Sequence, residues 1–403
     1  MHHFLLSLAL IVCGGVLPLF LWRHFFLMRA LAVSAMGAGC LLGLLDAGAK
    51  LFTPNTDGVA FTYLNTFSLS FQMDGLSAFF LIAIFAVSLL AALYSFAYMD
   101  DPKKALRTAS HYFFFSLLVS AMALVVTANN LITFILSWEI MSLSSFFLVV
   151  YNFEVAENRK AGYLYFVFSQ VGAMFIFAAF GVIYAHDGSF GFESAAALSE
   201  TAKILVFVLA FIGFGSKAGV FPFHVWLPHA HPAAPSHISA VMSGVMIKTG
   251  IYGILRIYTI LDWHTPLFGD IVLIAGMVSG ILGVVYALGQ HDLKRLLAYH
   301  SVENIGIILI GIGIGMIGVA AGKPVMAVLG FSGGLLHVLN HAIFKSLLFM
   351  GAGMVLHKTG TSAIDALGGL IKKMRITGTT FLIGALAISG LPPLNGFVSE
   401  FLI

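Results

Sequence analysis

The chain has 403 residues, of which 60% are hydrophobic and 9% are charged. Its mean hydropathy is +1.01. A soluble domain carries about 25% charged residues, so the composition excludes that class and indicates a polytopic membrane protein. The net charge of +3 identifies no partner, and no basic patch indicates nucleic-acid binding. Cys13 and Cys40 both fall in apolar runs, which favours neither a disulfide framework nor a metal site.

Apolar runs of about 18 or more residues predict membrane spans. We expect twelve, roughly at residues 4–22, 25–45, 75–99, 110–128, 130–151, 161–185, 203–221, 237–261, 268–290, 296–320, 325–356 and 376–403. The first run is long and a second follows closely, so we expect a transmembrane helix there rather than a cleavable signal peptide.

The basic residues of the loops predict the orientation of these spans. Thirteen Lys and Arg fall in one set of alternating loops, at 23–29, 100–109, 152–160, 222–236, 289–295 and 357–375. The other set holds three, Lys50, Lys203 and Lys323. Cytoplasmic loops carry the excess of positive charge. We therefore expect a multi-pass protein of the inner (cytoplasmic) membrane with its N-terminus outside.

Two outer loops have patterns of their own. The alternating sequence FTYLNTFSLSFQMDG within 46–74 predicts a short hairpin. The loop at 186–202 is acidic and rich in small residues, so we expect it to be solvated. No water-soluble domain fits anywhere along the chain.

The stretch 203–261 combines buried charge with a broken helix. Lys217 and Lys248 fall at membrane depth, and a helix break is expected near Gly219–Pro222, because proline ends helices. Non-helical backbone at this depth needs protein or a wet cavity around it. Four histidines lie between the two lysines, but the intervening prolines argue against a fixed metal-ligand geometry; they are His224, His229, His231 and His237.

Further ionisable residues fall within the predicted spans. The spacing i, i+4, i+8 places His337, His341 and Lys345 on one helix face, and His300 shares a face with Glu303. The remaining ones are Glu139, Arg256 and Glu400, the last of which follows a second expected break at Pro392 and Pro393.

These charges have two readings. Seven Lys, Arg and Glu side chains within the spans, together with the histidines, would cost on the order of 20 kcal/mol if they were scattered in lipid. This cost favours a single water-containing path in the protein interior. Any single pair could instead be a structural clasp, and we expect Arg256 to extend its head toward water rather than to conduct.

At these residues the sequence resembles the antiporter-like subunits of respiratory complex I, of multisubunit Na⁺/H⁺ antiporters and of membrane-bound nickel–iron hydrogenases. The resemblance covers nearly the whole chain and is carried by SWEIMSLSSFFLV, GFGSKAGVFPFHVWLPHAHPAAPSHISAVMSGVMIKTG, LLAYHSVENIGIILIG, GGLLHVLNHAIFKSLLFMGAG and LPPLNGFVSEF. The combination AYHSVENIGI with HVLNHAIFKS is most similar to the large membrane subunits of formate hydrogenlyase and hydrogenase-4.

The resemblance implies a fourteen-helix all-α fold with two inverted five-helix repeats that contain broken helices. We expect helices 1–3 over 1–108, the first repeat over 109–262 and an incomplete second repeat over 263–403. The sequence stops inside the twelfth helix, so we expect it to be a fragment.

The resemblance also implies roles for matching residues. Glu139 and Lys217 match the charge pair of the family, and Lys248 matches the linking lysine. His337 and Lys345 match the next steps, and Glu400 stands at the exit, where other members use lysine. His300 and Glu303 occupy positions where many relatives carry small polar residues. We expect protons to pass from Lys217 through Lys248 and the His337, His341, Lys345 row to Glu400.

We therefore expect a proton-translocating subunit of a membrane-bound hydrogenase or formate hydrogenlyase-type complex, with Na⁺ exchange left open. The chain has no cysteine cluster and no Gly-rich nucleotide motif, so we expect no catalytic chemistry in it. Nickel–iron and iron–sulfur clusters are expected in peripheral redox subunits, beside other membrane subunits. The alternatives are a subunit of a multisubunit Na⁺/H⁺ antiporter or of a complex I-type NADH:quinone oxidoreductase, and a passive membrane anchor.

Overall fold

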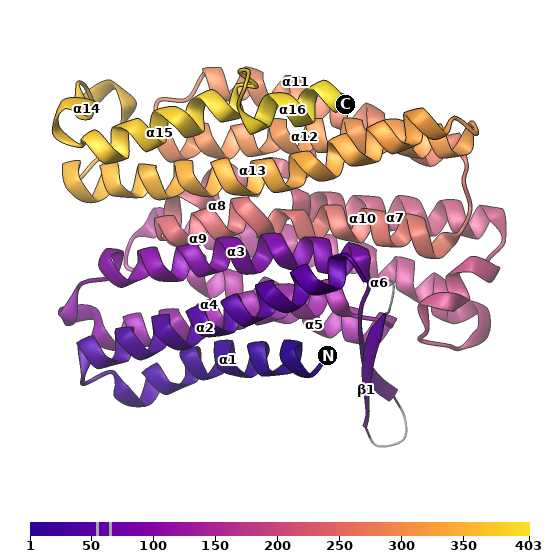
Figure 1. Cartoon of the computed structure of the whole chain (residues 1–403), viewed down its shortest axis with the longest axis horizontal. Helices are drawn as coiled ribbons and strands as arrows, with labels where there is room; N and C mark the ends of the chain where they lie inside the picture. The colour runs from indigo at the N-terminus through magenta and orange to yellow at the C-terminus, as the bar shows by residue number, and fades with distance from the viewer. Residues whose placement is uncertain (54–55, 64–66) are drawn as a thin grey trace. The chain divides into compact units, whose positions relative to one another are not determined.

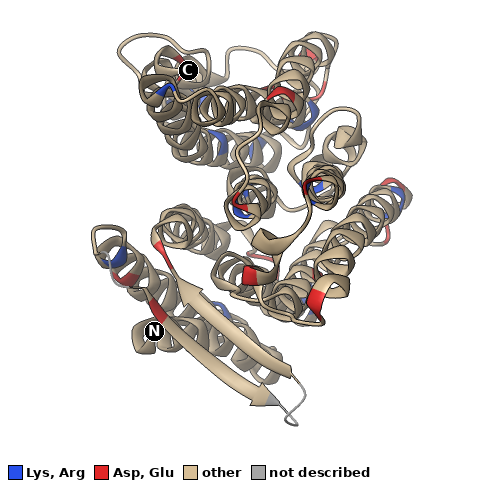
Figure 2. Ribbon diagram, turned by 90° about the vertical axis from the view of Figure 1, so that its right-hand side faces the viewer, with Lys and Arg blue, Asp and Glu red and all other residues tan. Residues whose placement is uncertain are grey.

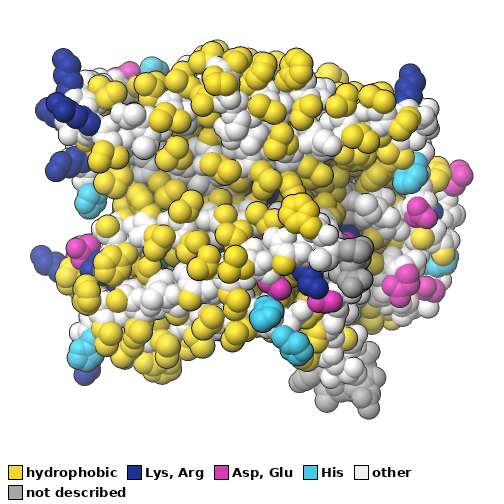
Figure 3. Space-filling view, viewed as in Figure 1, with side chains coloured by type: hydrophobic (Ala, Val, Ile, Leu, Met, Phe, Trp, Pro, Cys, Tyr) yellow, Lys and Arg dark blue, Asp and Glu magenta, His cyan; other side chains and the backbone are white. Residues whose placement is uncertain are grey.

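The computed structural model describes residues 1–53, 56–63 and 67–403. Within these residues, eleven helices are long and apolar enough to cross a membrane (Figure 1), which confirms a polytopic all-α membrane protein. The twelfth expected span, 376–403, is divided into α15 (Arg375–Ile388) and α16 (Asn395–Leu402). Charged residues are few along the ribbon (Figure 2), and hydrophobic side chains cover the sides of the helices on the face shown in Figure 3.

The chain forms two compact units. The first contains Met1–Gly213 and Tyr252–Leu261, and the second contains Phe214–Ile251 and Asp262–Ile403. Two helices, α7 (Glu200–Ala218) and α10 (Ile247–Leu261), belong in part to each unit. The division into inverted repeats stays a prediction.

The first unit is a helical bundle. Its spans are α1 (His2–Leu21), α2 (Phe25–Leu51), α3 (Gly75–Tyr98), α4 (Ala105–Thr127), α5 (Leu131–Val149) and α6 (Ala156–Asp187), with short 3₁₀ turns η1 (Pro102–Lys104) and η2 (Phe192–Ala197). α1 packs against α2 and α4, α2 against α3, and α5 against α4 and α6. Side chains cap two of the helices: Asp74 accepts from Ser77 N (2.8 Å) and Asn130 from Thr133 N (2.8 Å).

The two loops expected outside differ in how well the sequence predicts their structure. The hairpin is confirmed, with β1 (Asp57–Tyr63) antiparallel to β2 (Phe67–Met73) and Asp57 opposite Met73. Its turn, which includes Asn65, lies outside the described residues. The loop at 186–202, expected to be solvated, is exposed at most of its charged positions but buries Phe192 and Ala195 of η2. This loop is anchored by its backbone, since Leu131 N donates to Phe190 O (2.9 Å).

In the second unit, α13 contacts more elements than any other helix does. The helices of this unit are α8 (Leu227–Ala233), α9 (Ser236–Val241), α11 (Pro266–Leu288), α12 (Leu293–Ala320), α13 (Pro324–Thr359), α14 (Leu370–Lys373), α15 and α16, with η3 (Phe223–Trp226), the π-helical turn η4 (Met242–Met246) and η5 (Ile364–Ala366). α13 contacts α9, α12, α15 and α16, and α12 also contacts α8 and α11.

Glycine allows the closest of these helix contacts. A Cβ on Gly306 of α12 would lie 2.4 Å from the backbone N of Gly280 on α11. A Cβ on Gly330 of α13 would lie 2.5 Å from the backbone N of Gly315 on α12. Small residues let membrane helices approach until their backbones touch. Van der Waals packing then stabilises the contact, because the hydrophobic effect does not drive helices together in lipid. The glycine-rich sequences of α11, α12 and α13 therefore determine how tightly this unit packs.

The first predicted helix break is present where the sequence places it. α7 ends at Ala218, and Gly219 follows with φ +82°. The freed backbone groups find partners in the protein: Trp226 Nε1 donates to Ser216 O (2.9 Å) and Phe221 N donates to Ser279 Oγ (3.0 Å). These contacts satisfy the backbone without lipid exposure.

The segment after this break corrects one expectation. Residues 222–236 do not form a cytoplasmic loop, because they fold into η3 and α8, and much of this segment, including Trp226 and His231, is buried. Proline starts or ends short helices here rather than removing all helical structure. The positive-residue count is unaffected, since this segment contains no Lys or Arg.

The second break is also present. α15 ends at Ile388, Gly390 has φ +62°, and α16 begins at Asn395 after Pro392 and Pro393. Asn340 of α13 donates to Asn395 O (2.7 Å), and Asn395 Nδ2 donates back to Asn340 Oδ1 (3.0 Å). The restart of the helix is therefore fixed to the middle of α13.

Candidate functional site

Lys248 belongs to the second unit and is 1% exposed. It follows the π-helical turn η4 and donates to Ser243 O (2.5 Å). Its Nζ also contacts Nδ1 of His341 on α13. Two basic nitrogens in contact can hold a single proton on either one, so this contact can transfer a proton between helices.

The predicted row on α13 is confirmed as one buried face. His337, His341 and Lys345 are each 0% exposed. Within the described residues, Nε2 of His341 and Nζ of Lys345 have no hydrogen-bond partner, and the Lys345 Nζ stands 6.0 Å from the ring centre of Phe349. A buried polar atom without a partner costs about 1–3 kcal/mol. Such atoms are where buried water is found in proteins.

A chain of polar side chains continues from His337 toward the second break. Nε2 of His337 meets Asn304 Oδ1 (3.1 Å), and Nδ1 meets Ser399 Oγ (2.9 Å). Asn340 Nδ2 donates to the same Ser399 hydroxyl (2.9 Å). Sequence reasoning misses Asn304, Asn340 and Ser399 because neutral polar residues carry no charge that would mark them within a span. Asn304 nevertheless follows Glu303 directly, and Ser399 directly precedes Glu400.

Two of the three acids of the site, Glu303 and Glu400, adjoin Asn304 and Ser399 of this chain in sequence. Nδ1 of His300 contacts the Glu303 carboxylate, as their spacing predicts, and the side chains are 32% and 21% exposed. The Glu400 carboxylate lies against the second break, since a Cβ on Gly390 would be 2.3 Å from its Oε2. Glu400 is half-buried on α16. Both acids therefore lie nearer to solvent than the α13 row.

His231 and Lys294 form a second buried basic group that the sequence does not single out as a site. His231 is 0% exposed, and neither ring nitrogen has a hydrogen-bond partner among the described residues. Its ring packs 5.1 Å from Phe349, the same ring that Lys345 approaches. Lys294 is 2% exposed and donates to Ala234 O (2.9 Å) at the end of α8. The sequence places Lys294 in a loop, because it stands at the polar start of α12.

Glu139 and Lys217 are described in separate units. Glu139 is half-buried on α5, where Gln170 Nε2 donates to its Oε2 (3.1 Å), and its Oε1 has no hydrogen-bond partner among the described residues. Lys217 is 3% exposed at the end of α7. Sequence reasoning misses Gln170 because an amide within an apolar run gives a weak signal. The pairing of Glu139 with Lys217 stays a prediction.

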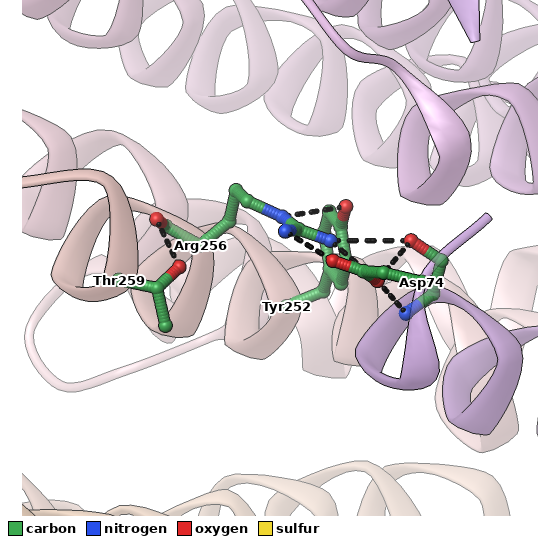
Figure 4. Close-up of polar contacts among 5 residues, drawn as sticks. Asp74, Tyr252, Arg256 and Thr259 are labelled. Carbon is green, nitrogen blue, oxygen red and sulfur yellow. Dashed lines mark hydrogen bonds and ion pairs between the residues drawn. The ribbon is translucent and has the colours of Figure 1, made fainter. Parts of the chain in front are cut away.

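Arg256 corrects another expectation. Rather than extending into water, it is held by Asp74, the residue that caps α3, with Nη1–Oδ2 2.6 Å and Nη2–Oδ1 2.9 Å (Figure 4). Tyr252 and Ser77 complete the group. Burial raises the pKa of Asp74, but the Arg256 guanidinium more than offsets this and leaves that pKa below its ordinary value. Arg256 is therefore a structural cation.

The buried polar side chains of the second unit lie in series. In the part of the chain that the structure describes, no three His, Cys, Asp or Glu side chains are placed to hold a metal ion. The arrangement in the second unit is a series of buried proton acceptors and donors, from Lys248 through α13 to the second break.

Comparison with known proteins agrees with this geometry. The family profile described as NADH:quinone oxidoreductase/Mrp antiporter, TM, matches residues 128–403, and that of NADH-Ubiquinone oxidoreductase (complex I), chain 5 N-terminus, matches 62–107. Hydrogenase-4 component B of Escherichia coli (strain K12) is 44% identical over 338 residues, covering 83% of this chain and 50% of the relative. Formate hydrogenlyase subunit 3 of the same organism is 36% identical over 383 residues, covering 94% and 61%.

Two solved structures share the fold. A chain of the membrane-bound sulfane sulfur reductase, an archaeal respiratory membrane complex, matches with TM-score 0.85 and 31% identity over 98% of this chain and 64% of that one. A chain of the Mrp complex from Dietzia sp. DQ12-45-1b matches with TM-score 0.81 and 22% identity, covering 98% and 73%. This chain thus spans between half and about three fifths of the two curated relatives. It belongs to the family of membrane subunits shared by NADH:quinone oxidoreductases and Mrp antiporters.

Proposed function

We propose that this chain translocates protons as an antiporter-like subunit of a membrane-bound hydrogenase or formate hydrogenlyase-type complex. The observation that carries the proposal is the contact between Lys248 and His341, which joins the helix after the first break to the buried row on α13. The identity to hydrogenase-4 component B and formate hydrogenlyase subunit 3 favours this type of complex.

In the proposed path, a proton on Lys248 passes to His341 and leaves Lys248 neutral. A lysine in a dry site favours its neutral form, because burial disfavours the charge. Lys345 lies one turn further along the same face of α13, and water at its bare Nζ would connect it to His341. In the other direction, His337 and the Ser399 hydroxyl lead toward Glu400 at the second break.

The passive-anchor alternative accounts poorly for these atoms. A clasp needs its charges paired, since an unpaired buried charge is strongly destabilising. Yet Lys345 Nζ and His341 Nε2 have no hydrogen-bond partner among the described residues. A group that gains and loses a proton works better without a fixed ion-pair partner, because such a partner stabilises only one of its two protonation states.

The complex around the chain belongs to the same proposal. Peripheral partner subunits would carry nickel–iron and iron–sulfur clusters and drive the transport. We place the complex in the inner membrane with the N-terminus of this chain outside, following the distribution of Lys and Arg among the loops.

The test is proton movement in membrane vesicles that contain the assembled complex. Lys345→Gln removes a buried basic group of the path, and Lys323→Gln is the matched control, because Lys323 is exposed just before α13. We expect acidification driven by the redox reaction to fall at least about ten-fold with the first variant, as when a proton-transfer group is lost. The control should pump normally. Normal pumping by both variants, with the complex intact, would contradict the proposal.

Membership of a multisubunit Na⁺/H⁺ antiporter is the second candidate. A protein of Alkalihalophilus pseudofirmus that is named as part of an Na⁺/H⁺ antiporter is 33% identical over 341 residues. An antiporter without redox partners would collapse a pre-formed pH gradient when Na⁺ is added to vesicles, with no electron donor present. A gradient that Na⁺ leaves unchanged, together with acidification that requires a donor, favours the hydrogenase-type complex.

A further inference from the structure

A basic groove lies on the first unit, where η1 leads into α4. It has a volume of about 640 Å³ and is lined by residues of η1, α4, α5 and the turn after α5. Cations line one part, namely Lys103, Lys104 and Arg107, and aromatic side chains line much of the rest. The transport path uses none of these residues.

The two lysines leave positive charge available in the groove. Both are exposed, and Lys103 has no ion-pair partner among the described residues. Lys104 Nζ lies 3.8 Å from Asp101 Oδ2, which is too far for a hydrogen bond, so this ion pair is weak. Arg107, by contrast, is fixed: its Nη1 donates to Glu154 Oε2 (2.9 Å), and its guanidinium lies 4.9 Å from the Phe153 ring centre.

The apolar part of the groove lies on membrane-spanning helices. Phe114 of α4 stacks on Phe147 of α5 with ring centres 4.4 Å apart. Phe147 is 45% exposed, and Leu106 beside it in the lining is 56% exposed. Both helices are candidate spans, so their exposed apolar side chains meet hydrocarbon in a bilayer.

We infer that this groove binds a phospholipid with an anionic headgroup. Lys103 and Lys104 stand at the start of a span, at the level where lipid phosphates lie, and they attract the headgroup. Phe114, Phe147 and Leu106 receive part of an acyl chain below it. The occupant is lipid rather than free phosphate, because half of the lining residues are apolar side chains that contact an acyl chain and would stay uncovered by a phosphate ion.

The test compares two lipids on the purified full chain. After delipidation in detergent, the protein is mixed with phosphatidylglycerol or with phosphatidylcholine of the same acyl chains, and bound lipid is counted by native mass spectrometry. We expect the wild type to prefer phosphatidylglycerol. The double variant Lys103→Gln, Lys104→Gln should lose that preference by roughly 30-fold, at about a factor of five for each lysine near an anionic headgroup. Both side chains are exposed, so the variant should fold.

The matched control is Lys372→Gln, Lys373→Gln, which removes an equally exposed pair from α14. It should bind as the wild type does. An equal loss in both double variants would reduce the effect to general surface charge and overturn the site. Full displacement of the lipid by millimolar inorganic phosphate would overturn the lipid assignment.

The apolar part has its own test. Phe147→Ser should weaken retention of both lipids several-fold while leaving the preference between them unchanged, because it alters chain contact and not charge. In native membranes, a photo-crosslinker at position 147 should capture lipid. Exclusive capture of a protein would overturn the lipid assignment and show a protein interface in this groove instead. Neither result depends on proton translocation.

Discussion

Replacing Lys248 by arginine separates a proton carrier from a fixed cation. Arginine keeps the positive charge and can still donate to the Ser243 carbonyl, which accepts from Lys248 at 2.5 Å. However, arginine does not deprotonate in proteins, and with a pKa above 12 fewer than about one molecule in 10⁵ is neutral at pH 7. The contact with His341 can then no longer pass a proton. We expect pumping to fall below detection, as it should in Lys248→Ala.

The assay is acidification of vesicles that contain the assembled complex, with subunit content measured on the same preparation. Lys248→Ala leaves His341 without its Lys248 contact and creates a cavity, so it alone would not distinguish lost transfer from lost packing. Lys323→Arg, an exposed substitution of the same kind, is the control and should pump normally. If Lys248→Arg pumps near the wild-type rate in an intact complex, Lys248 is a structural cation and the relay is refuted.

Four further predictions concern the first unit. Arg256→Gln should lower the free energy of unfolding by about 1–3 kcal/mol, seen as a lower melting temperature in detergent, because it leaves Asp74 without its cation. Because the pKa of Asp74 is lowered in the folded state, ionised Asp74 stabilises the fold above about pH 4, and this stabilisation is lost as the pH falls through the pKa of Asp74 in the folded protein. Asp74→Asn should remove this part of the dependence of stability on acid. Glu139→Gln should reduce pumping about ten-fold or more while the complex still assembles, and an assembly defect with normal pumping in the remaining complexes would make Glu139 structural. In a background without Cys13 and Cys40, a membrane-impermeant thiol reagent added outside should label cysteine at position 53 and not at position 104, and the reverse pattern would invert the topology.

Many residues of the proposed path could be predicted from the sequence, because the patterns that indicate them are local. A charged lysine within an apolar run is costly in a membrane, and a cluster of proline and glycine can end a helix. The breaks at Gly219 and Gly390 and the single face of His337, His341 and Lys345 follow from such signals, and all are present. The hairpin pattern is local as well.

Other features depend on which segments meet. The sequence does not indicate that Lys248 contacts His341, 93 positions later, or that the Ser399 hydroxyl lies between His337 and Asn340. The expectation for Arg256 is wrong for the same reason, since its partner Asp74 is 182 residues away. The prolines of 222–236 predict a loop, yet the carbonyl of Ala234 is satisfied by Lys294 of another helix. Local composition determines where a helix can break and where a charge is expensive, but only tertiary packing supplies the partner that makes the broken backbone or the buried charge tolerable.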